Sequence, residues 1–244
     1  KITFTSSAAS PSIGDWKFIR FNSTASSATF DGSGNYLSGS ILQYCTVEYA
    51  GFGSTSPGNV PAVKLDQVAT FIDRCTFQHN SNSALYYGPV TGPLSSAAST
   101  TLRITNNTLD DNGTPVMYIS AGNTLVISDN TISNSRNPIV GGTHNGNGIR
   151  LESGMPTPLT LTMDGNTITD NPYHGLRLGV GFSTISASIT DNRFNNNSGY
   201  GIVFYDDSSN ASNASSITIE RNDFVGNSLG GVALGAKLDS NSPA

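Results

Sequence analysis

The segment 163–171 reads Met-Asp-Gly-Asn-Thr-Ile-Thr-Asp-Asn, and the pattern of its residues decides the fold. An Asn is followed by a large apolar residue two positions later and by a second Asn five positions later. The same pattern recurs in segments 104–112, 189–197 and 219–227, and segment 127–132 repeats its first half. Segments 42–47 and 72–80 carry Cys where the first Asn stands. An internal repeat of this kind indicates a chain built from stacked copies of one structural unit.

The first Asn of each copy, or the Cys in its place, defines a column of equivalent positions. The spacing between successive members varies from 23 to 36 residues, and the extra residues fall in stretches rich in Gly, Ser and Pro. Within each copy the apolar residues alternate with a period of two, whereas a helical solenoid requires a period of about 3.6. We therefore predict strands joined by loops of variable length. The members of the column are Cys45, Cys75, Asn107, Asn130, Asn166, Asn192 and Asn222.

A second short apolar strand follows each copy, for example at 148–151, 175–178 and 201–204. Stacking such units pairs each strand with its equivalent in the next unit, about 4.8 Å away. The sequence thus predicts an all-β fold, a single-stranded parallel β-helix (solenoid) of about seven or more coils. Residues 1–40 would form an N-terminal partial coil continuous with the solenoid, residues 41–238 the β-helix itself, and residues 239–244 a C-terminal tail.

Two kinds of column are expected in the interior of such a stack. The apolar residue of each copy would point inward, and the Asn amides would hydrogen-bond to the next coil and satisfy polar groups at the corner. Asn also tolerates the left-handed backbone that tight corners require. The inward apolar column comprises Val47, Phe77, Leu109, Ile132, Ile168, Phe194 and Phe224. A second Asn column comprises Asn80, Asn112, Asn171, Asn197 and Asn227, with Ala50 and Ser135 in the other two coils.

With these motifs the chain resembles the right-handed parallel β-helix repeat proteins of the pectate-lyase-like class, from about Gly39 to Leu234. The N-terminal segments 2–7, 14–21 and 44–50 resemble the opening coils of β-helix modules in large secreted or cell-surface proteins of bacteria and archaea. The resemblance implies a right-handed coil, a secreted or cell-surface location and a larger parent protein. It does not specify an activity, because lyases, hydrolases, epimerases, phage spikes and adhesins share this fold.

Composition excludes several classes of partner. The chain has 244 residues, of which 12% are charged, and its formal net charge is -5. There is no cluster of Lys and Arg, so nucleic acid is not an expected partner. No apolar run approaches the roughly 20 residues that a transmembrane helix needs, so no transmembrane segment is expected. Two cysteines are too few for a disulfide scaffold.

The second strand of each unit offers an outward row of side chains, because alternate residues of a strand face opposite sides of a sheet. Arg150 and Arg177 fall in consecutive copies of this strand. Their guanidinium groups would therefore be neighbours and would repel each other unless an anion lies between or near them. The expected row is Lys64, Leu85, Met117, Arg150, Arg177, Val203 and Ala233.

Further polar residues share this face, since Glu152 lies two residues beyond Arg150 and His174 precedes the strand of Arg177. One interpretation is a site for an anion or an acidic sugar. The other is a solvated sheet on which Glu152 pairs with both Arg side chains. The ligand-binding candidates are Arg150, Arg177, Tyr205, Asp206 and His174, and the catalytic candidates, if the chain is an enzyme, are Arg150, Arg177 and Glu152.

Metal binding has one candidate set, at turn positions after the Asn corner. Asp110, Asp111 and Asp170 could contribute to an oxygen-rich calcium site. No two of them occupy one position in adjacent coils, so solvated turn residues are the alternative, and calcium is the one cofactor considered. Two Cys and three scattered His lack the ligand spacing of a zinc site.

Cys45 and Cys75 occupy the same column in adjacent coils. Their separation would permit a disulfide. Parallel strands in register aim both side chains the same way, however, so two stacked free thiols are an equally good interpretation.

The hypothesis that follows is an extracellular or cell-surface module with a structural, adhesive or polysaccharide-binding role. Its partner would be a polysaccharide, another surface protein or a second copy of the chain. The alternative is a polysaccharide lyase or glycoside hydrolase that acts on an acidic polysaccharide. The absence of an acidic cluster on the second strand favours a protein that is not an enzyme.

Overall fold

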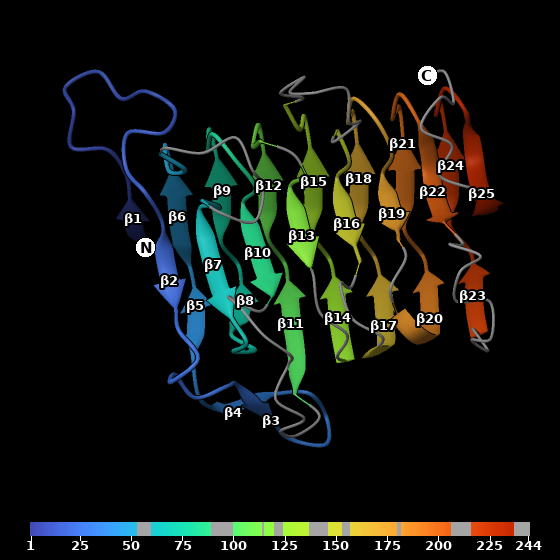
Figure 1. Ribbon diagram of the computed structural model, residues 1–244, viewed down its shortest axis with the longest axis horizontal. Helices are drawn as coiled ribbons and strands as arrows, with labels where there is room; N and C mark the ends of the chain where they lie inside the picture. Colours follow the sequence, from blue (N-terminus) through green and yellow to red (C-terminus); the bar gives the residue numbers. More distant parts are fainter. Residues whose placement is uncertain are drawn as a thin grey trace.

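The computed structural model is all-β in every part of the chain that it describes, namely residues 1–52, 60–88, 100–113, 115–119, 124–136, 146–152, 157–179, 182–205 and 216–236. Three long parallel sheets each extend along the long axis of the molecule, with their strands following one another along that axis (Figure 1). The chain passes from sheet I to sheet II to sheet III in each coil and then starts the next coil. The predicted parallel β-helix is thus confirmed, and each strand pairs with its equivalent one coil away.

Sheet I contains seven strands: β5 (Ile41–Gln43), β8 (Phe71–Asp73), β11 (Thr101–Thr105), β14 (Thr124–Ser128), β17 (Thr157–Asp164), β20 (Phe182–Thr190) and β23 (Ser216–Glu220). Sheet II contains eight: β1 (Ile2–Phe4), β6 (Cys45–Glu48), β9 (Thr76–Gln78), β12 (Thr108–Asp110), β15 (Thr131–Ser133), β18 (Thr167–Thr169), β21 (Arg193–Asn195) and β24 (Asp223–Val225). Sheet III also contains eight: β2 (Ile19–Phe21), β7 (Val63–Asp66), β10 (Leu85–Gly88), β13 (Met117–Ile119), β16 (Ile149–Leu151), β19 (Leu176–Leu178), β22 (Tyr200–Tyr205) and β25 (Gly230–Ala236).

A small hairpin departs from the solenoid near its N-terminal end. Strands β3 (Thr29–Phe30) and β4 (Tyr36–Ser38) pair antiparallel, and Figure 1 shows them below β5, β8 and β11. The Phe30 ring lies 5.3 Å from that of Phe71, and the Arg103 guanidinium lies over Phe30 at 4.7 Å. The hairpin therefore rests on the first strands of sheet I through aromatic and cation–π contacts.

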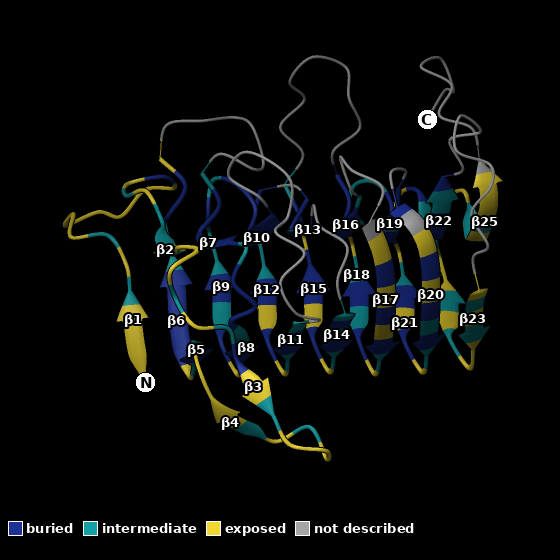
Figure 2. Ribbon diagram, turned by 60° about the horizontal axis from the view of Figure 1, so that its bottom comes forward, coloured by how far each residue is buried: buried dark blue, intermediate teal, exposed yellow. Residues whose placement is uncertain are grey.

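The core runs the length of the stack between the three sheets (Figure 2). The inward column on sheet II is fully buried from Val47 to Phe194, as the repeat predicts. Phe224 continues it in the last described coil, where the ring stacks on Phe194 with a centroid separation of 5.4 Å. One apolar residue per coil therefore builds a continuous interior, which no single coil could bury alone.

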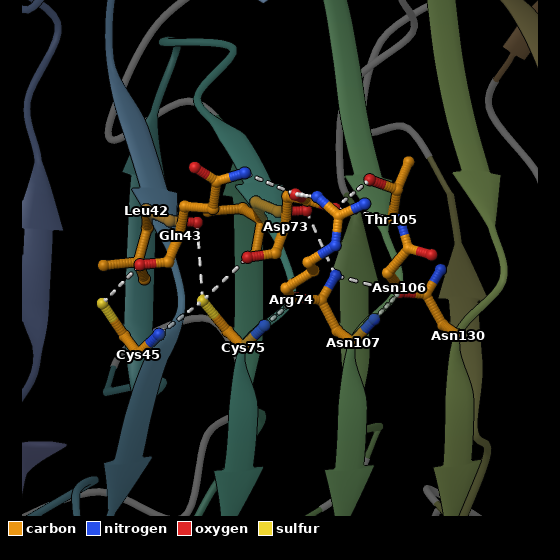
Figure 3. A network of polar contacts seen from close by, with 11 residues as sticks. Leu42, Gln43, Cys45, Asp73, Arg74, Cys75, Thr105, Asn106, Asn107 and Asn130 are labelled. Carbon is orange, nitrogen blue, oxygen red and sulfur yellow. Dashed lines mark hydrogen bonds and ion pairs between the residues drawn. The ribbon is translucent and has the colours of Figure 1, made fainter. Parts of the chain in front are cut away.

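The first ladder lies at the corner between sheets I and II (Figure 3). The Asn107 amide Nδ2 donates to Asn130 Oδ1 at 2.9 Å, and the Asn107 backbone N–H donates to the same oxygen. The same pair of bonds joins Asn130 to Asn166 and Asn166 to Asn192. These bonds confirm the predicted ladder, and they satisfy the corner amides that burial would otherwise leave unpaired.

The second ladder, between sheets II and III, follows the same scheme. Asn171 Nδ2 donates to Asn197 Oδ1 at 2.9 Å, and Asn197 Nδ2 donates to Asn227 Oδ1 at 2.9 Å. The predicted replacements also fit, because the backbone N–H of Ala50 donates to Asn80 Oδ1 and that of Ser135 donates to Asn171 Oδ1. A residue without an amide side chain thus ends or interrupts a ladder without losing its own backbone bond.

The left-handed backbone lies one residue before the position that we expected. Asn106, Asp129 and Asp191 have φ near +57°, and each directly precedes a ladder Asn whose own φ is not positive. The expectation that the ladder Asn supplies the left-handed conformation is therefore wrong. The ladder side chain must point inward to reach the next coil, so the sharp bend falls on its neighbour, where even Tyr44 and Arg74 are tolerated.

Cys45 and Cys75 are buried free thiols stacked in the first ladder. The Cys45 backbone N–H donates to Cys75 Sγ at 3.4 Å, and Cys45 Sγ donates to the Gln43 carbonyl at 3.2 Å. Burial raises the pKa of Cys75 to about 12. The stacked-thiol interpretation matches this arrangement, and the Cys75 thiol is protonated at neutral pH.

Candidate functional site

The outer face of sheet III carries a row of aromatic and basic side chains in register. The paired positions, from the N-terminal coil onward, are Arg20, Lys64, Tyr86, Tyr118, Arg150, Arg177, Val203 and Ala233. We call these residues the sheet III row. Because successive strands lie about 4.8 Å apart, the row is a straight file along the solenoid axis with one side chain per coil.

Two members of the row differ from the sequence prediction. Leu85 and Met117 were expected to face outward, but both point into the core, and Tyr86 and Tyr118 take their places in the row. The row is not uniformly accessible, because Tyr86 is 8% and Val203 1% exposed, whereas Tyr118 is half-buried. A shift of one residue moves every side chain of a strand to the other face. In the structure Leu85 pairs with Met117 and Met117 pairs with Ile149, so both belong to the inward file and not to the file of Arg150.

Arg150 and Arg177 occupy directly paired positions on β16 and β19, yet their guanidinium groups diverge. The Arg150 guanidinium lies 5.2 Å from the centroid of the Tyr118 ring, one coil back. The Arg177 guanidinium lies 4.9 Å from the Tyr205 ring, one coil forward. Each cation thus rests on a different tyrosine, which reduces their mutual repulsion without an anion between them.

Glu152 forms an ion pair with Arg150 and none with Arg177, although its charge also acts on Arg177. Its Oε2 atom lies 2.7 Å from an Arg150 terminal nitrogen and accepts a second bond from Arg150 Nε at 2.8 Å. Its Oε1 atom accepts a hydrogen bond from the Tyr118 hydroxyl. The ion pair is partly buried, with side-chain exposures of 20% for Arg150 and 16% for Glu152. The two-point contact holds the Glu152 carboxylate in a fixed position beside the row.

Arg177 is a cation without a carboxylate partner among the residues that the structure describes. None of the ion pairs of the described chain includes it, and its Nε atom is buried without a hydrogen-bond partner. Burial and then the charge of Arg150 lower the pKa of Arg177, whereas the Glu152 carboxylate raises it and offsets part of their effect. The net shift disfavours the charged form, so an anion bound at this position would relieve the remaining electrostatic penalty.

An aromatic cluster adjoins Arg177 at the entry to β19 and β22. His174 is 1% exposed, its Nδ1 atom accepts the backbone N–H of Tyr200 at 2.9 Å, and its Nε2 atom lies 3.2 Å from the Tyr205 hydroxyl. The rings of Tyr173 and Tyr200 lie against that of His174. Burial raises the pKa of Tyr205 to about 12, so this phenol keeps its proton at neutral pH.

The N-terminal part of the row has the same character. The Lys64 ammonium lies 5.7 Å from the Tyr86 ring centroid, and the rings of Tyr86 and Tyr118 meet edge to face at 5.4 Å. Arg20 forms an ion pair with the buried carboxylate of Asp66. Along the described row, Lys64 and Arg177 are thus cations without an ion pair, whereas Arg20 and Arg150 each have one.

The three aspartates considered for calcium each bond to different protein groups. Asp111 forms a hydrogen bond with His79 at 2.6 Å and an ion pair with Arg136 at 2.8 Å. Asp110 accepts bonds from Ser133 and Asn134, and Asp170 accepts one from Thr169. Within the described ranges, no group of three or more His, Cys, Asp or Glu side chains could hold a metal ion. Asp206, a candidate of the sheet III site, lies outside the described residues.

Comparison with known protein families assigns this chain to a family. The family model for a right-handed β-helix region matches residues 61–241. This chain belongs to the right-handed β-helix family. A search of curated proteins and one of solved structures gave no significant match. The members of a β-helix family share an architecture and not a reaction. Family membership therefore establishes the right-handed coil, and the function has to be inferred from the site.

Among the described residues, no helix is long and apolar enough to cross a bilayer.

Proposed function

We propose that this right-handed β-helix is an extracellular or cell-surface module that binds an acidic polysaccharide along the outer face of sheet III. The observation that carries the proposal is the sheet III row, in which Lys64, Tyr86, Tyr118, Arg150 and Arg177 follow one another on consecutive coils. A straight file of this kind suits an extended polymer, because a ligand lying along the axis meets one side chain per coil.

The chemistry of the row suits a sugar. Tyrosine rings offer an apolar face for the C–H groups of a pyranose and a hydroxyl for its polar edge. Arginine offers planar donors that match a carboxylate or vicinal hydroxyls. Both Arg150 and Arg177 already lie over tyrosine rings, so their positions are set before a ligand arrives, which lowers the entropic cost of binding.

Charge favours an acidic ligand. The chain as a whole carries a net charge of -5, but four of the eight positions of the row are Arg or Lys. Asp66 and Glu152 neutralise two of these cations, and Lys64 and Arg177 remain without an ion pair in the described structure. A local excess of positive charge on an acidic protein steers anions toward this face.

Binding is favoured over cleavage because the groups near Arg177 are poorly suited to remove a proton. The raised pKa of Tyr205 keeps the phenol protonated, and the Glu152 carboxylate already accepts bonds from Arg150 and Tyr118. A general base needs a free lone pair and a pKa near the working pH. A lyase or hydrolase remains the alternative hypothesis.

The test is a panel of acidic and neutral polysaccharides, with binding and end-group release measured together. We expect binding of at least one acidic polysaccharide without new unsaturated or reducing ends. Replacement of Tyr118 by Ala should weaken binding by about tenfold, because the ring that positions the Arg150 guanidinium is lost. The matched control is Thr131→Ala, an exposed residue of sheet II that should leave binding unchanged. Cleavage of any bound polymer would overturn the proposal in favour of the enzyme.

A further inference from the structure

The sheet III row distributes its charge unevenly, and the distribution bears on which acidic polysaccharide fits. Arg177 lacks an ion pair among the described residues, whereas Arg150 on the adjacent strand is bound by the Glu152 carboxylate. The next two members, Tyr118 and Tyr86, are uncharged. Lys64 then follows, four coils and about 19 Å from Arg177 at the usual strand spacing. The two cations without an ion pair, Arg177 and Lys64, are thus separated by three coils that offer no unpaired cation.

The position of Glu152 makes the coil of Arg150 unfavourable for a second anion. Glu152 extends from the end of β16 on the same face as the row, and both of its oxygen atoms are already engaged. A sugar carboxylate on the coil of Arg150 would face this carboxylate at short range. Like charges at a partly buried position repel strongly, since the surrounding protein screens them less than water does.

The guanidinium groups of Arg150 and Arg177 also point away from each other, so they cannot both bind carboxylates on adjacent sugars. Arg150 leans toward Tyr118 and Arg177 toward Tyr205, so the two cations serve different coils. A neutral sugar suits the coil of Arg150, because the Arg150–Glu152 pair offers both donors and acceptors to hydroxyl groups. A sugar advances along a polymer by a distance close to one coil, so neighbouring sugars meet neighbouring members of the row.

We infer that the polysaccharide bound by sheet III is sparsely charged, with a carboxylate-bearing sugar at Arg177 followed by an uncharged sugar at Arg150 and Glu152. This inference rests on the proposed function and adds a selectivity to it. Arg177 supplies the attraction for the anion, and Glu152 excludes a second anion from the adjacent coil. Specificity of this kind combines one attractive and one repulsive contact.

The test compares three hexasaccharides of equal length by isothermal titration calorimetry. Hyaluronan carries a carboxylate on alternate sugars, hexagalacturonate carries one on every sugar, and cellohexaose carries none. We expect the wild type to bind the hyaluronan hexasaccharide at least about tenfold more tightly than hexagalacturonate, and the difference to shrink in high salt.

Two variants assign the roles. Glu152→Gln removes the charge; its one carbonyl oxygen can still accept from Arg150, and its NH2 group can donate to the Tyr118 hydroxyl oxygen in place of the original bond. It should therefore strengthen hexagalacturonate binding and reduce the preference to within about threefold. Arg177→Gln should reduce the affinity for both acidic ligands to that for cellohexaose. Glu220→Gln and Arg193→Gln are the matched controls, because these exposed residues carry the same charges on other sheets.

The outcomes distinguish a failure of the inferred selectivity from a failure of the proposed function. Equal or tighter binding of hexagalacturonate by the wild type overturns the inference and leaves the proposed function standing. A Glu152→Gln protein with an unchanged preference also overturns it, since Glu152 would then exclude nothing. Failure of the wild type to bind any of the three ligands or any polysaccharide of the wider panel overturns the proposed function and the inference together.

Discussion

At the residue scale, the fold depends on a few side chains that each satisfy several polar groups. Asn166 is fully buried and illustrates the point. Its Oδ1 atom accepts the backbone N–H and the amide of Asn130, and its Nδ2 atom donates to Ile127 O at 2.8 Å and to Asn192 Oδ1 at 2.8 Å. No apolar residue of the same size can replace these bonds, which is why the position repeats as Asn.

Truncation of this residue tests the ladder. Asn166→Ala removes the side-chain acceptor of the buried Asn130 N–H and a donor to the Ile127 carbonyl. We expect a loss of about 3 kcal/mol in the free energy of unfolding, since each buried unpaired group costs about 1–3 kcal/mol. Urea denaturation followed by circular dichroism measures it. The exposed Thr131→Ala substitution should change stability by less than about 0.5 kcal/mol. A loss as small as that of the control would contradict a structural role for the ladder.

The Cys75 thiol predicts a dependence of stability on alkaline pH. Its pKa is about 12 in the folded chain and 9.0 when unperturbed, with burial as the main cause. The folded state therefore holds a proton that the unfolded state releases, so the contribution of Cys75 is complete below about pH 9 and is lost progressively as the pH rises toward 12.

We expect Cys75→Ser to remove this part of the pH dependence. The wild type should lose up to about 1.4 kcal/mol per pH unit more than the variant above pH 9. Chemical denaturation at several pH values between 7 and 11 measures the difference. Parallel curves for the two proteins over that range would show that the thiol does not titrate as described.

At the element scale, the strands and corners were predictable and the exact faces of two strands were not. The strict alternation around Asn166 or Asn192 identified the inward column, the two ladders and the parallel stacking, because buried side chains repeat in every coil. The register of β10 and β13 was misassigned, because Leu85-Tyr86-Tyr87 and Met117-Tyr118-Ile119 carry apolar or aromatic residues on both faces. A period of two cannot be read where both faces look apolar.

The candidate site was also predictable only in part, but for a different reason. Arg150 and Arg177 stand between apolar residues, so their outward direction follows from the sequence. The divergence of their guanidinium groups over Tyr118 and Tyr205 depends on side-chain packing between coils, which no spacing along the chain encodes.

The close packing at the start of the sheet III strands supports a prediction at this scale. A Cβ atom on Gly175 would lie 2.7 Å from the Gly201 carbonyl oxygen and 2.9 Å from Phe194 Cδ1. We expect Gly175→Ala to destabilise the protein by about 2 kcal/mol, because a filled core must shift to admit the methyl group. Gly32→Ala is the matched control, since no atom lies within 4 Å of its added Cβ. Thermal unfolding of both variants measures the effect, and equal melting temperatures would show that the strand entry is not tightly packed.

At the scale of the whole molecule, the solenoid is a one-dimensional stack in which each coil touches only its neighbours. Interior coils bury their core residues on both sides, whereas the last described coil leaves Val232 and Leu234 of the inward file of sheet III exposed (Figure 2). Stability in such a stack is a sum of coil and interface contributions. The cost of one substitution should therefore depend on its position along the axis more than on its chemistry.

Two phenylalanines of the same column test this dependence. Phe77 is 0% exposed with a coil on each side, and Phe224 is half-buried with a stacked partner, Phe194, on one side only. Phe77→Ala should cost about 4 kcal/mol, because it removes a fully buried ring and leaves a cavity between two coils. Phe224→Ala should cost only about 2 kcal/mol, since water already reaches part of that ring and can fill the space. Equilibrium denaturation of the two variants measures both losses in the free energy of unfolding, and the substitution is Phe to Ala in each case. Equal losses would mean that the C-terminal coil is as well covered as the interior, and that the stack unfolds as one unit without weaker ends.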